Sequence, residues 1–209
     1  MTSPAADPAG AIVFTDIVGF TELTDLHGDD AALALVDEQL AIVRHALPSG
    51  ARIVKELGDG LMLWFDDAAD AIETALHLQR HFTSACVGEM PLWVRIGMHW
   101  GTPKRRGDDI IGRDVNLASR VSDLAGAGEV VVTDRLIEAA GGSAAFHDVA
   151  FESLGSVFVK GFVDPVPVSL AASTGAGGPD LMLDREFDQD RGQPAGSDRT
   201  EDAACASAE

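Results

Sequence analysis

The chain has 209 residues, of which 46% are hydrophobic, and a formal net charge of −19 at pH 7. This length and composition predict one compact domain with a sizeable core, and the acidic balance argues against nucleic acid and acidic membrane surfaces as partners. No apolar run is long enough to cross a bilayer and residues 1–10 lack the features of a signal peptide, so we expect a cytoplasmic protein with no membrane partner.

The first predicted elements are a strand at residues 12–18 and a helical pattern over residues 19–47. Residues 12–18 form an almost unbroken apolar, β-branched run, which is typical of a strand buried on both faces. Asp16 lies near the C-terminal end of this run. A carboxylate there is costly unless a metal or another partner compensates its charge.

Two shorter strands follow, at residues 53–57 and 61–65, and the Gly58-Asp59-Gly60 sequence between them is typical of a tight turn. A right-handed crossover through the helix makes the strands at 12–18 and 53–57 parallel. The C-terminal end of the first strand and the tip of the hairpin then lie at the same end of the sheet. Asp16 and Asp59 are therefore predicted to face one another.

These two carboxylates have two interpretations. Brought together they repel, and a hard cation such as Mg²⁺ or Mn²⁺ suits an all-oxygen pair that leaves places for water and phosphate. The alternative is that Asp16 caps the helix and Asp59 is only a turn residue. Asp59 by itself would favour the turn, whereas its predicted position beside Asp16 favours a metal site.

The next elements complete a split βαβ arrangement. Residues 67–84 have the pattern of an amphipathic helix and residues 92–100 that of a strand, which gives the order strand, helix, strand, strand, helix, strand. The predicted fold class is α+β with a ferredoxin-like βαββαβ core. Residues 101–109 are predicted to be a loop, in which Lys104, Arg105 and Arg106 form a solvated charge cluster.

A further helical pattern over residues 112–125 places Asn116 and Arg120 four positions apart, one above the other on the helix. An amide and a guanidinium in this arrangement can grip a hydroxyl and a phosphate, or they can be a surface pair, and the spacing does not decide between the two. A strand at 129–132, a helix opening at Thr133 and strands over residues 146–170 form a C-terminal extension. There Lys160 lies beside Gly161.

The composition changes after residue 170. Residues 171–209 hold nine acidic residues and three arginines among Gly, Ala, Ser and Pro, and are predicted to be a disordered acidic tail. We therefore expect a short disordered N-terminus at residues 1–10, one folded domain at residues 11–170 and the tail at residues 171–209.

Over residues 11–170 the sequence resembles the catalytic domain of class III nucleotide cyclases. Five blocks in the right order carry the resemblance: residues 14–21 (FTDIVGFT), 55–59 (KELGD), 109–112 (DIIG), 115–120 (VNLASR) and 159–161 (VKG). The resemblance implies the class III nucleotide cyclase fold and a catalytic domain. It further implies that Asp16 and Asp59 are metal-binding aspartates that hold two divalent cations, Mg²⁺ or Mn²⁺.

The resemblance implies roles for five further residues. Lys55 and Asp109 match the pair that selects adenine. Asn116 matches the residue that orients the ribose, Arg120 the one that stabilises the transition state, and Lys160 a lysine that holds the terminal phosphates. The residues after Asp109 depart from the family, because two isoleucines stand where aromatic residues are frequent.

Base choice follows from hydrogen-bonding groups. Adenine offers an acceptor at N1 and a donor at N6, which fit the Lys55 ammonium and the Asp109 carboxylate. Guanine presents the reverse pattern and would leave both side chains mispaired. The expected substrate is therefore ATP.

The expected assembly is a homodimer. Lys55 falls on the same strand face as Ile53 and Leu57, so it either snorkels at an edge or reaches into an interface. The resemblance implies that the metal-binding aspartates of each site come from one subunit. The adenine-selecting residues Lys55 and Asp109, together with Asn116 and Arg120, come from the other. Since one chain holds all of them, a head-to-tail homodimer with two equivalent sites is expected.

The sequence thus predicts an adenylate cyclase, with a guanylate cyclase or a catalytically weak nucleotide-binding homologue as alternatives. The usual mark of a weak homologue is loss of a carboxylate or of Arg120, and none is lost. A diguanylate cyclase would carry a Gly-Gly-Asp/Glu-Glu-Phe hairpin, and a P-loop nucleotidase a glycine loop with Lys and Ser or Thr. Neither motif occurs in the sequence.

Overall fold

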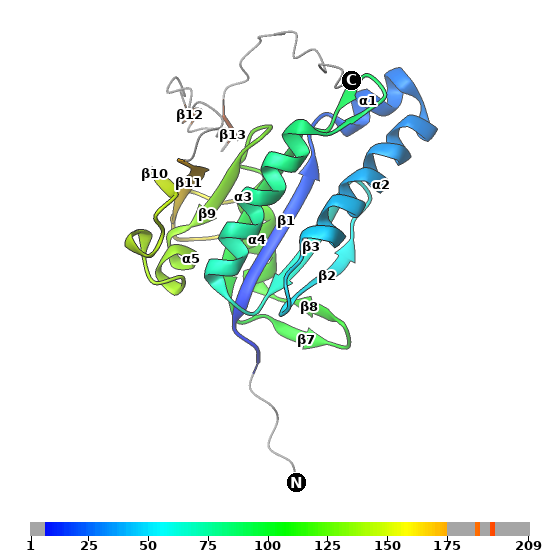
Figure 1. Ribbon diagram of the computed structural model, residues 1–209. Helices are drawn as coiled ribbons and strands as arrows, with labels where there is room; N and C mark the ends of the chain where they lie inside the picture. Colours follow the sequence, from blue (N-terminus) through cyan, green and yellow to red (C-terminus); the bar gives the residue numbers. More distant parts are fainter. Residues whose placement is uncertain (1–6, 175–186, 189–192, 195–209) are drawn as a thin grey trace.

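The computed structural model describes residues 7–174, 187–188 and 193–194, so most of the predicted N-terminal segment and tail lies outside the described residues. A seven-stranded mixed sheet has the order β10-β11-β9-β6-β1-β3-β2 (Figure 1). Its strands are β1 (Gly10–Ile17), β2 (Ala51–Glu56), β3 (Gly60–Phe65), β6 (Val94–Gly101), β9 (Val130–Thr133), β10 (Val149–Val157) and β11 (Val166–Ser173).

Helices and small ribbons surround this sheet. The helices are α1 (Phe20–His27), α2 (Asp29–Ala46), α3 (Ala68–Ser84), α4 (Arg113–Ser122) and α5 (Asp134–Ala139), with a 3₁₀ turn η1 (Ser143–Ala145). The two-stranded ribbons are β4 (Cys86–Val87) with β5 (Met90–Pro91), β7 (Lys104–Arg106) with β8 (Asp109–Ile111), and β12 (Phe187–Asp188) with β13 (Gln193–Pro194). Within the described part of the chain, no helix combines the length and the apolar character needed to span a bilayer.

The predicted βαββαβ core is confirmed. The elements β1, α1–α2, β2, β3, α3 and β6 follow in that order, and the four strands lie side by side as β6-β1-β3-β2. Both β1 and β2 are antiparallel to β3, which lies between them, so β1 and β2 run in the same direction as predicted. β9 pairs parallel to β6 and, with α5, β10 and β11, makes the C-terminal extension.

The two faces of the sheet are covered differently. Helices α2 and α3 lie on one face (Figure 1) and enclose the largest hydrophobic cluster, which includes Leu35, Phe65 and Phe82. On the other face the shorter helix α4 packs Ala118 against a smaller cluster that contains Phe14. This contact needs Gly97 on β6, because a Cβ there would lie 2.1 Å from the Ser122 backbone nitrogen.

The prediction of a loop at residues 101–109 is wrong in part. Lys104–Arg106 pairs with Asp109–Ile111 as the β7–β8 ribbon, joined by a turn at Gly107 and Asp108. The predicted exposure of the basic residues is confirmed, and Lys104 forms an ion pair with Asp7. Pairing with the following residues satisfies backbone groups that a loop would leave to water.

Candidate active site

The end of β1 and the tip of the β2–β3 hairpin meet, as the sequence predicts. Asp16 pairs with Gly60 in the β1–β3 ladder. The Ile17 N–H donates to the Asp59 carbonyl oxygen at 3.2 Å. A Cβ on Gly60 would lie 2.5 Å from the Thr15 carbonyl oxygen, so the absence of a side chain allows this close approach. The predicted juxtaposition of Asp16 and Asp59 is confirmed.

The electrostatics of this edge suit a cation. Burial, and then the negative charge of Asp16, raise the pKa of the Asp59 carboxyl above its ordinary value, although its own backbone hydrogen bond and Arg95 act in the opposite direction. Both aspartates are partly exposed and offer oxygen donors, which fit Mg²⁺ or Mn²⁺. Among the described residues, no three His, Cys, Asp or Glu side chains gather closely enough to hold a metal. A cation here would therefore take further ligands from water or substrate.

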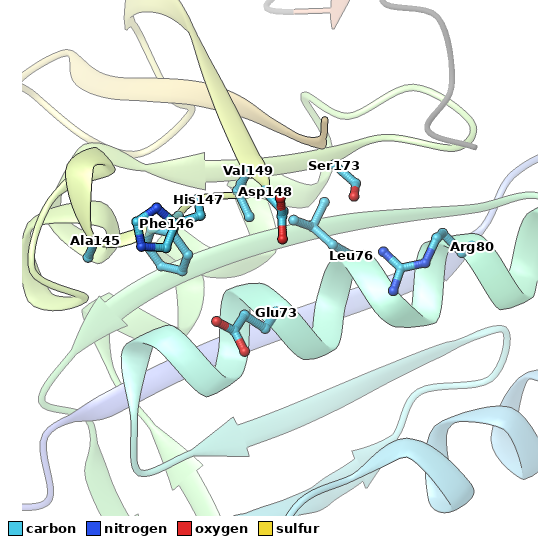
Figure 2. A pocket seen from close by; sticks show the side chains of 9 residues that line it. All are labelled: Glu73, Leu76, Arg80, Ala145, Phe146, His147, Asp148, Val149 and Ser173. Atoms are coloured by element: carbon cyan, nitrogen blue, oxygen red, sulfur yellow. The ribbon is translucent and has the colours of Figure 1, made fainter. Parts of the chain in front are cut away.

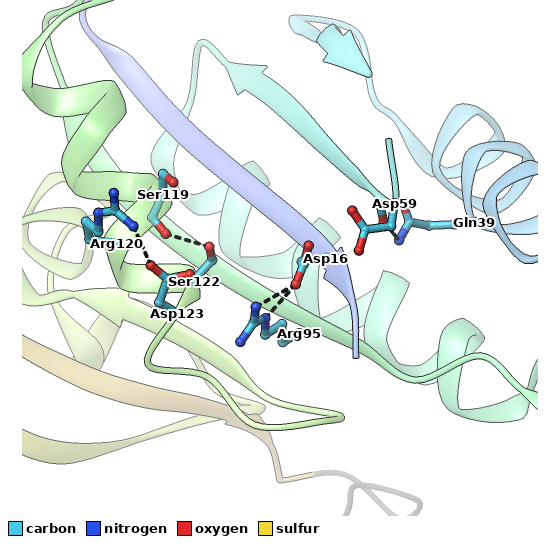
Figure 3. A network of polar contacts seen from close by, with 8 residues as sticks. All are labelled: Asp16, Gln39, Asp59, Arg95, Ser119, Arg120, Ser122 and Asp123. Carbon is cyan, nitrogen blue, oxygen red and sulfur yellow. Dashed lines mark hydrogen bonds and ion pairs between the residues drawn. The ribbon is translucent and has the colours of Figure 1, made fainter. Parts of the chain in front are cut away.

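Arg95 on β6 is a site residue that the sequence analysis missed. Its Nε donates to an Asp16 carboxylate oxygen at 2.8 Å, and one terminal nitrogen lies 2.7 Å from the same oxygen (Figure 3). Both side chains are 28% exposed, so the ion pair is open to solvent and to a competing cation. The signal was a charged residue, Arg95, in a mostly apolar strand, but only the β1–β6 register identifies its partner.

A buried polar network from α2 supports the hairpin tip (Figure 3). Gln39 is 1% exposed, and its amide nitrogen donates to the Asp59 carbonyl oxygen at 3.4 Å. The Thr15 hydroxyl donates to the Gln39 amide oxygen at 3.5 Å. Gln39 follows Leu35 and precedes Val43 on the buried stripe of α2. A polar residue on such a stripe needs a partner, which was the unused signal in the sequence.

Lys55 and Asp109 form the closest ion pair among the predicted site residues, with 2.5 Å between Nζ and a carboxylate oxygen. The hydrogen bond from Lys55 lowers the pKa of the Asp109 carboxyl below its usual range. The prediction that Lys55 shares a strand face with Ile53 is wrong, because a bulge shifts the register between them. Ile53 pairs with Leu63 and Lys55 with Met62, so Lys55 points to the face that α4 and β8 cover.

The two predicted residues of α4 lie on its exposed side. Asn116 and Arg120 are both exposed and one helical turn apart, as the spacing predicts. Arg120 donates to the Asp123 carboxylate at 3.0 Å, and Figure 3 shows this pair at the C-terminal end of α4, apart from Asp16 and Asp59. In a single chain the guanidinium is therefore engaged locally rather than at the edge where the two aspartates meet.

Lys160 is remote from the two aspartates in the same chain. It lies in the turn region between β10 and β11, and β11 then pairs Val168 with Thr133 at the C-terminal end of β9. β9 is parallel to β6, and β6 is antiparallel to β1, so this is the end at which β1 begins. Asp16 lies where β1 ends. The predicted site residues thus form separate groups within one chain.

A buried histidine ties α4 to the sheet beneath it. His99 is 3% exposed; its Nδ1 lies 3.0 Å from Thr133 Oγ1, and its Nε2 lies 3.7 Å from an Asp114 carboxylate oxygen in the first turn of α4. The second Asp114 oxygen accepts from the Thr102 N–H at 2.7 Å. Sequence reasoning passed over His99, since one histidine in an apolar strand has no distinguishing pattern.

We expect His99 to make the fold sensitive to acid. Burial lowers the pKa of His99 to about 4, opposed by Asp114 and assisted by the charges of Arg135 and Arg113. The unfolded chain therefore binds more protons between pH 6.5 and 4, and stability falls as pH falls through that range, by about 3 kcal/mol. His99→Gln should remove most of this slope in urea denaturation at pH 7, 6, 5 and 4.5. The exposed His147→Gln is the control, and an unchanged slope in His99→Gln would contradict the assignment.

Comparisons with known proteins bear on the family and the fold of the chain. A sequence model of the family described as the adenylate and guanylate cyclase catalytic domain matches residues 4–170. An adenylate cyclase of Streptomyces coelicolor is 36% identical over 129 residues, which cover 61% of this chain and 33% of that protein. A pH-sensitive adenylate cyclase of Mycobacterium tuberculosis is 31% identical over 130 residues, covering 62% of this chain and 32% of that protein. The chain thus spans about a third of the length of these relatives.

Solved structures give the same fold. One from a study of adenylate cyclases of Trypanosoma brucei in their monomeric state has a TM-score of 0.74 at 21% identity, covering 85% of this chain and 92% of that one. An adenylyl cyclase from P. aeruginosa has a TM-score of 0.67 at 25% identity, covering 81% and 96%. The predicted class III nucleotide cyclase fold is confirmed.

Proposed function

The chain belongs to the adenylate and guanylate cyclase catalytic domain family, and we propose that it converts ATP into 3′,5′-cyclic AMP and pyrophosphate. The observation that carries the choice of ATP is the Lys55–Asp109 ion pair. A donor and an acceptor held side by side match adenine N1 and N6 and mismatch guanine. The relatives named adenylate cyclase support the same choice.

The reaction needs one bond to form as another breaks. The ribose 3′-hydroxyl oxygen bonds to the α-phosphorus, the bond from that phosphorus to the leaving pyrophosphate oxygen breaks, and the hydroxyl proton passes to solvent. Two divalent cations, Mg²⁺ or Mn²⁺, held by Asp16 and Asp59 would lower the pKa of the hydroxyl and offset phosphate charge. These two carboxylates lie where the raised pKa of Asp59 makes a bound cation favourable.

Three cationic side chains have distinct proposed roles on the phosphates. Arg95 is paired with Asp16, and once a cation binds that carboxylate, the guanidinium would be free to bind an anion at the same edge. Arg120 would exchange its exposed Asp123 partner for the charge that grows on the α-phosphoryl oxygens in the transition state. Lys160 would hold the terminal phosphates, and Asn116 would orient the ribose.

We further propose that each active site is shared between two copies of the chain. Arg120 lies on the exposed side of α4, and Lys160 lies at the opposite end of the sheet from Asp16. A second copy placed head to tail would present these residues to the aspartates of the first and would generate two equivalent sites. This arrangement uses the sheet face that α4 and the β7–β8 ribbon cover.

The test of the substrate is an assay of the purified chain with ATP and with GTP, each with Mg²⁺ and with Mn²⁺. We expect cyclic AMP as the main product. In Lys55→Glu combined with Asp109→Ala, kcat/KM for ATP should fall by at least about a hundredfold. Adenine N1 would then face a carboxylate instead of a donor, and N6 would lose its acceptor. Cyclic GMP formation should fall far less.

A matched control separates base recognition from the loss of an ion pair. Glu56 lies next to Lys55 on β2 and forms an exposed ion pair with Arg44 at 3.3 Å. Glu56→Gln should leave the kinetics with ATP unchanged. If the Lys55 and Asp109 double variant also kept its ATP kinetics, the adenine assignment would be wrong.

A further inference from the structure

Two histidines face one another on the exposed side of α3, away from the sheet. His77 and His81 are one helical turn apart and both are exposed. Their Nε2 atoms lie 3.0 Å apart, and the rings meet edge to face with centroids separated by 4.4 Å. The function proposed above uses neither residue.

The protonation state of the pair follows from Arg80. A guanidinium nitrogen of Arg80 lies 3.3 Å from His77 Nδ1, and arginine can only donate, so Nδ1 is an acceptor. His77 then carries its proton on Nε2 and donates it to Nε2 of His81. Both rings are therefore neutral, which is the form that binds metals. Burial, and then any positive charge on His81, Arg80 or His45, lowers the pKa of His77 and so favours its neutral form.

We propose that His77 and His81 form a chelating site for a borderline transition-metal ion such as Zn²⁺, Cu²⁺ or Ni²⁺. Two nitrogens that each lie about 2.0–2.1 Å from a tetrahedral ion are about 3.3–3.4 Å apart. The observed 3.0 Å separation needs only a small opening to reach that value. Imidazole pairs suit these ions, whereas Mg²⁺ and Mn²⁺ prefer the carboxylates of the other site.

Binding would exchange two hydrogen bonds for two metal–nitrogen bonds. Coordination through His77 Nε2 moves the ring proton to Nδ1, which displaces Arg80. Arg80 has room to move, because it also borders an open groove of about 360 Å³ between α3 and the η1–β10 segment (Figure 2). Among the described residues no third His, Cys, Asp or Glu completes the set. Water fills the remaining positions.

A metal ion bound to both histidines would stabilise a turn of α3 that also contacts the sheet. Gln79, between the two histidines in sequence, is buried on the opposite side of α3 and donates to the Val94 carbonyl oxygen at 3.0 Å. Val94 precedes Arg95 on β6. A bound ion should therefore stabilise the folded chain and raise its Tm.

The experiment is a titration of the full chain, without a histidine tag, with Zn²⁺. Calorimetry gives the affinity, and the imidazole nitrogen shifts of His77 and His81 in NMR identify the ligands. Loss of an outer-shell partner alone weakens metal affinity about 10–100-fold, so His77→Ala and His81→Ala should each weaken it by at least about tenfold. Arg80→Gln should tighten binding, because it removes both a competing hydrogen bond and a positive charge.

Two control variants and a second measurement make the result decisive. The exposed His147→Ala should bind Zn²⁺ like the wild type, and Asp16→Asn should do so as well, which separates this site from the one proposed for catalysis. The Zn²⁺-dependent rise in Tm should disappear in His77→Ala and His81→Ala. Unchanged affinity in both histidine variants, or no shift of their imidazole nitrogens, would overturn the proposal.

Discussion

Asp59→Asn is expected to abolish cyclic nucleotide formation without lowering the Tm of the metal-free protein. Burial and the Asp16 charge already disfavour the ionised carboxylate, so a neutral amide relieves repulsion in the absence of metal. Activity should fall by at least about a thousandfold, because a metal supplies several kcal/mol of transition-state stabilisation and about 1.4 kcal/mol is a factor of ten. The activity is measured as cyclic product formed at saturating Mg²⁺ or Mn²⁺, and the Tm is measured by thermal unfolding of the metal-free protein.

Asp16→Asn should be as inactive as Asp59→Asn, but its effect on stability should differ. It leaves the Arg95 guanidinium without its carboxylate, and since both side chains are partly exposed the loss should be about 1 kcal/mol. Added Mg²⁺ should raise the Tm of the wild type and of neither variant. Asp25→Asn, an exposed acid on α1, is the control. Near-normal activity in either variant at saturating metal would show that the two-aspartate site is wrong.

The contrast between these variants shows what the sequence could predict at this edge. The strand at Asp16 and the glycine-flanked turn at Asp59 are local patterns, and one handedness rule brings them together. The charge balance is not local. Arg95 reaches Asp16 through a cross-strand register, and the two are 79 positions apart in sequence. Identifying that partner requires knowing which strands are neighbours and how they are aligned.

The adenine-selecting residues Lys55 and Asp109 show a second limit of prediction from the sequence. The family resemblance predicts that Lys55 and Asp109 act together, and they are in contact. Strand alternation, however, assigns Lys55 to the face of Ile53, and the bulge reverses this. A bulge depends on how one strand fits its partner, so an alternating pattern in one strand does not reveal it. Here the irregularity aims the lysine at β8.

Mixing two inactive variants is expected to restore activity if the site is shared between chains. Asp16→Ala homodimers would lack the metal site twice, and Arg120→Ala homodimers would lack the guanidinium twice. A mixed dimer has both defects in one site and none in the other. With equal concentrations and free exchange about half of the dimers are mixed, so activity should return to about a quarter of the wild-type value. Cyclic product formed by the mixture, compared with each variant alone, measures this.

The control for this experiment uses two defects on the same side of the site. In a mixture of Asp16→Ala and Asp59→Ala, each chain brings a damaged aspartate pair to its own site, so every dimer has two dead sites and no activity should return. Differently tagged chains, captured together, establish that mixed dimers form. If they form and the Asp16→Ala and Arg120→Ala mixture still stays inactive, each site is built within one chain. Arg120 would then have to exchange Asp123 for a substrate held at Asp16 of its own chain.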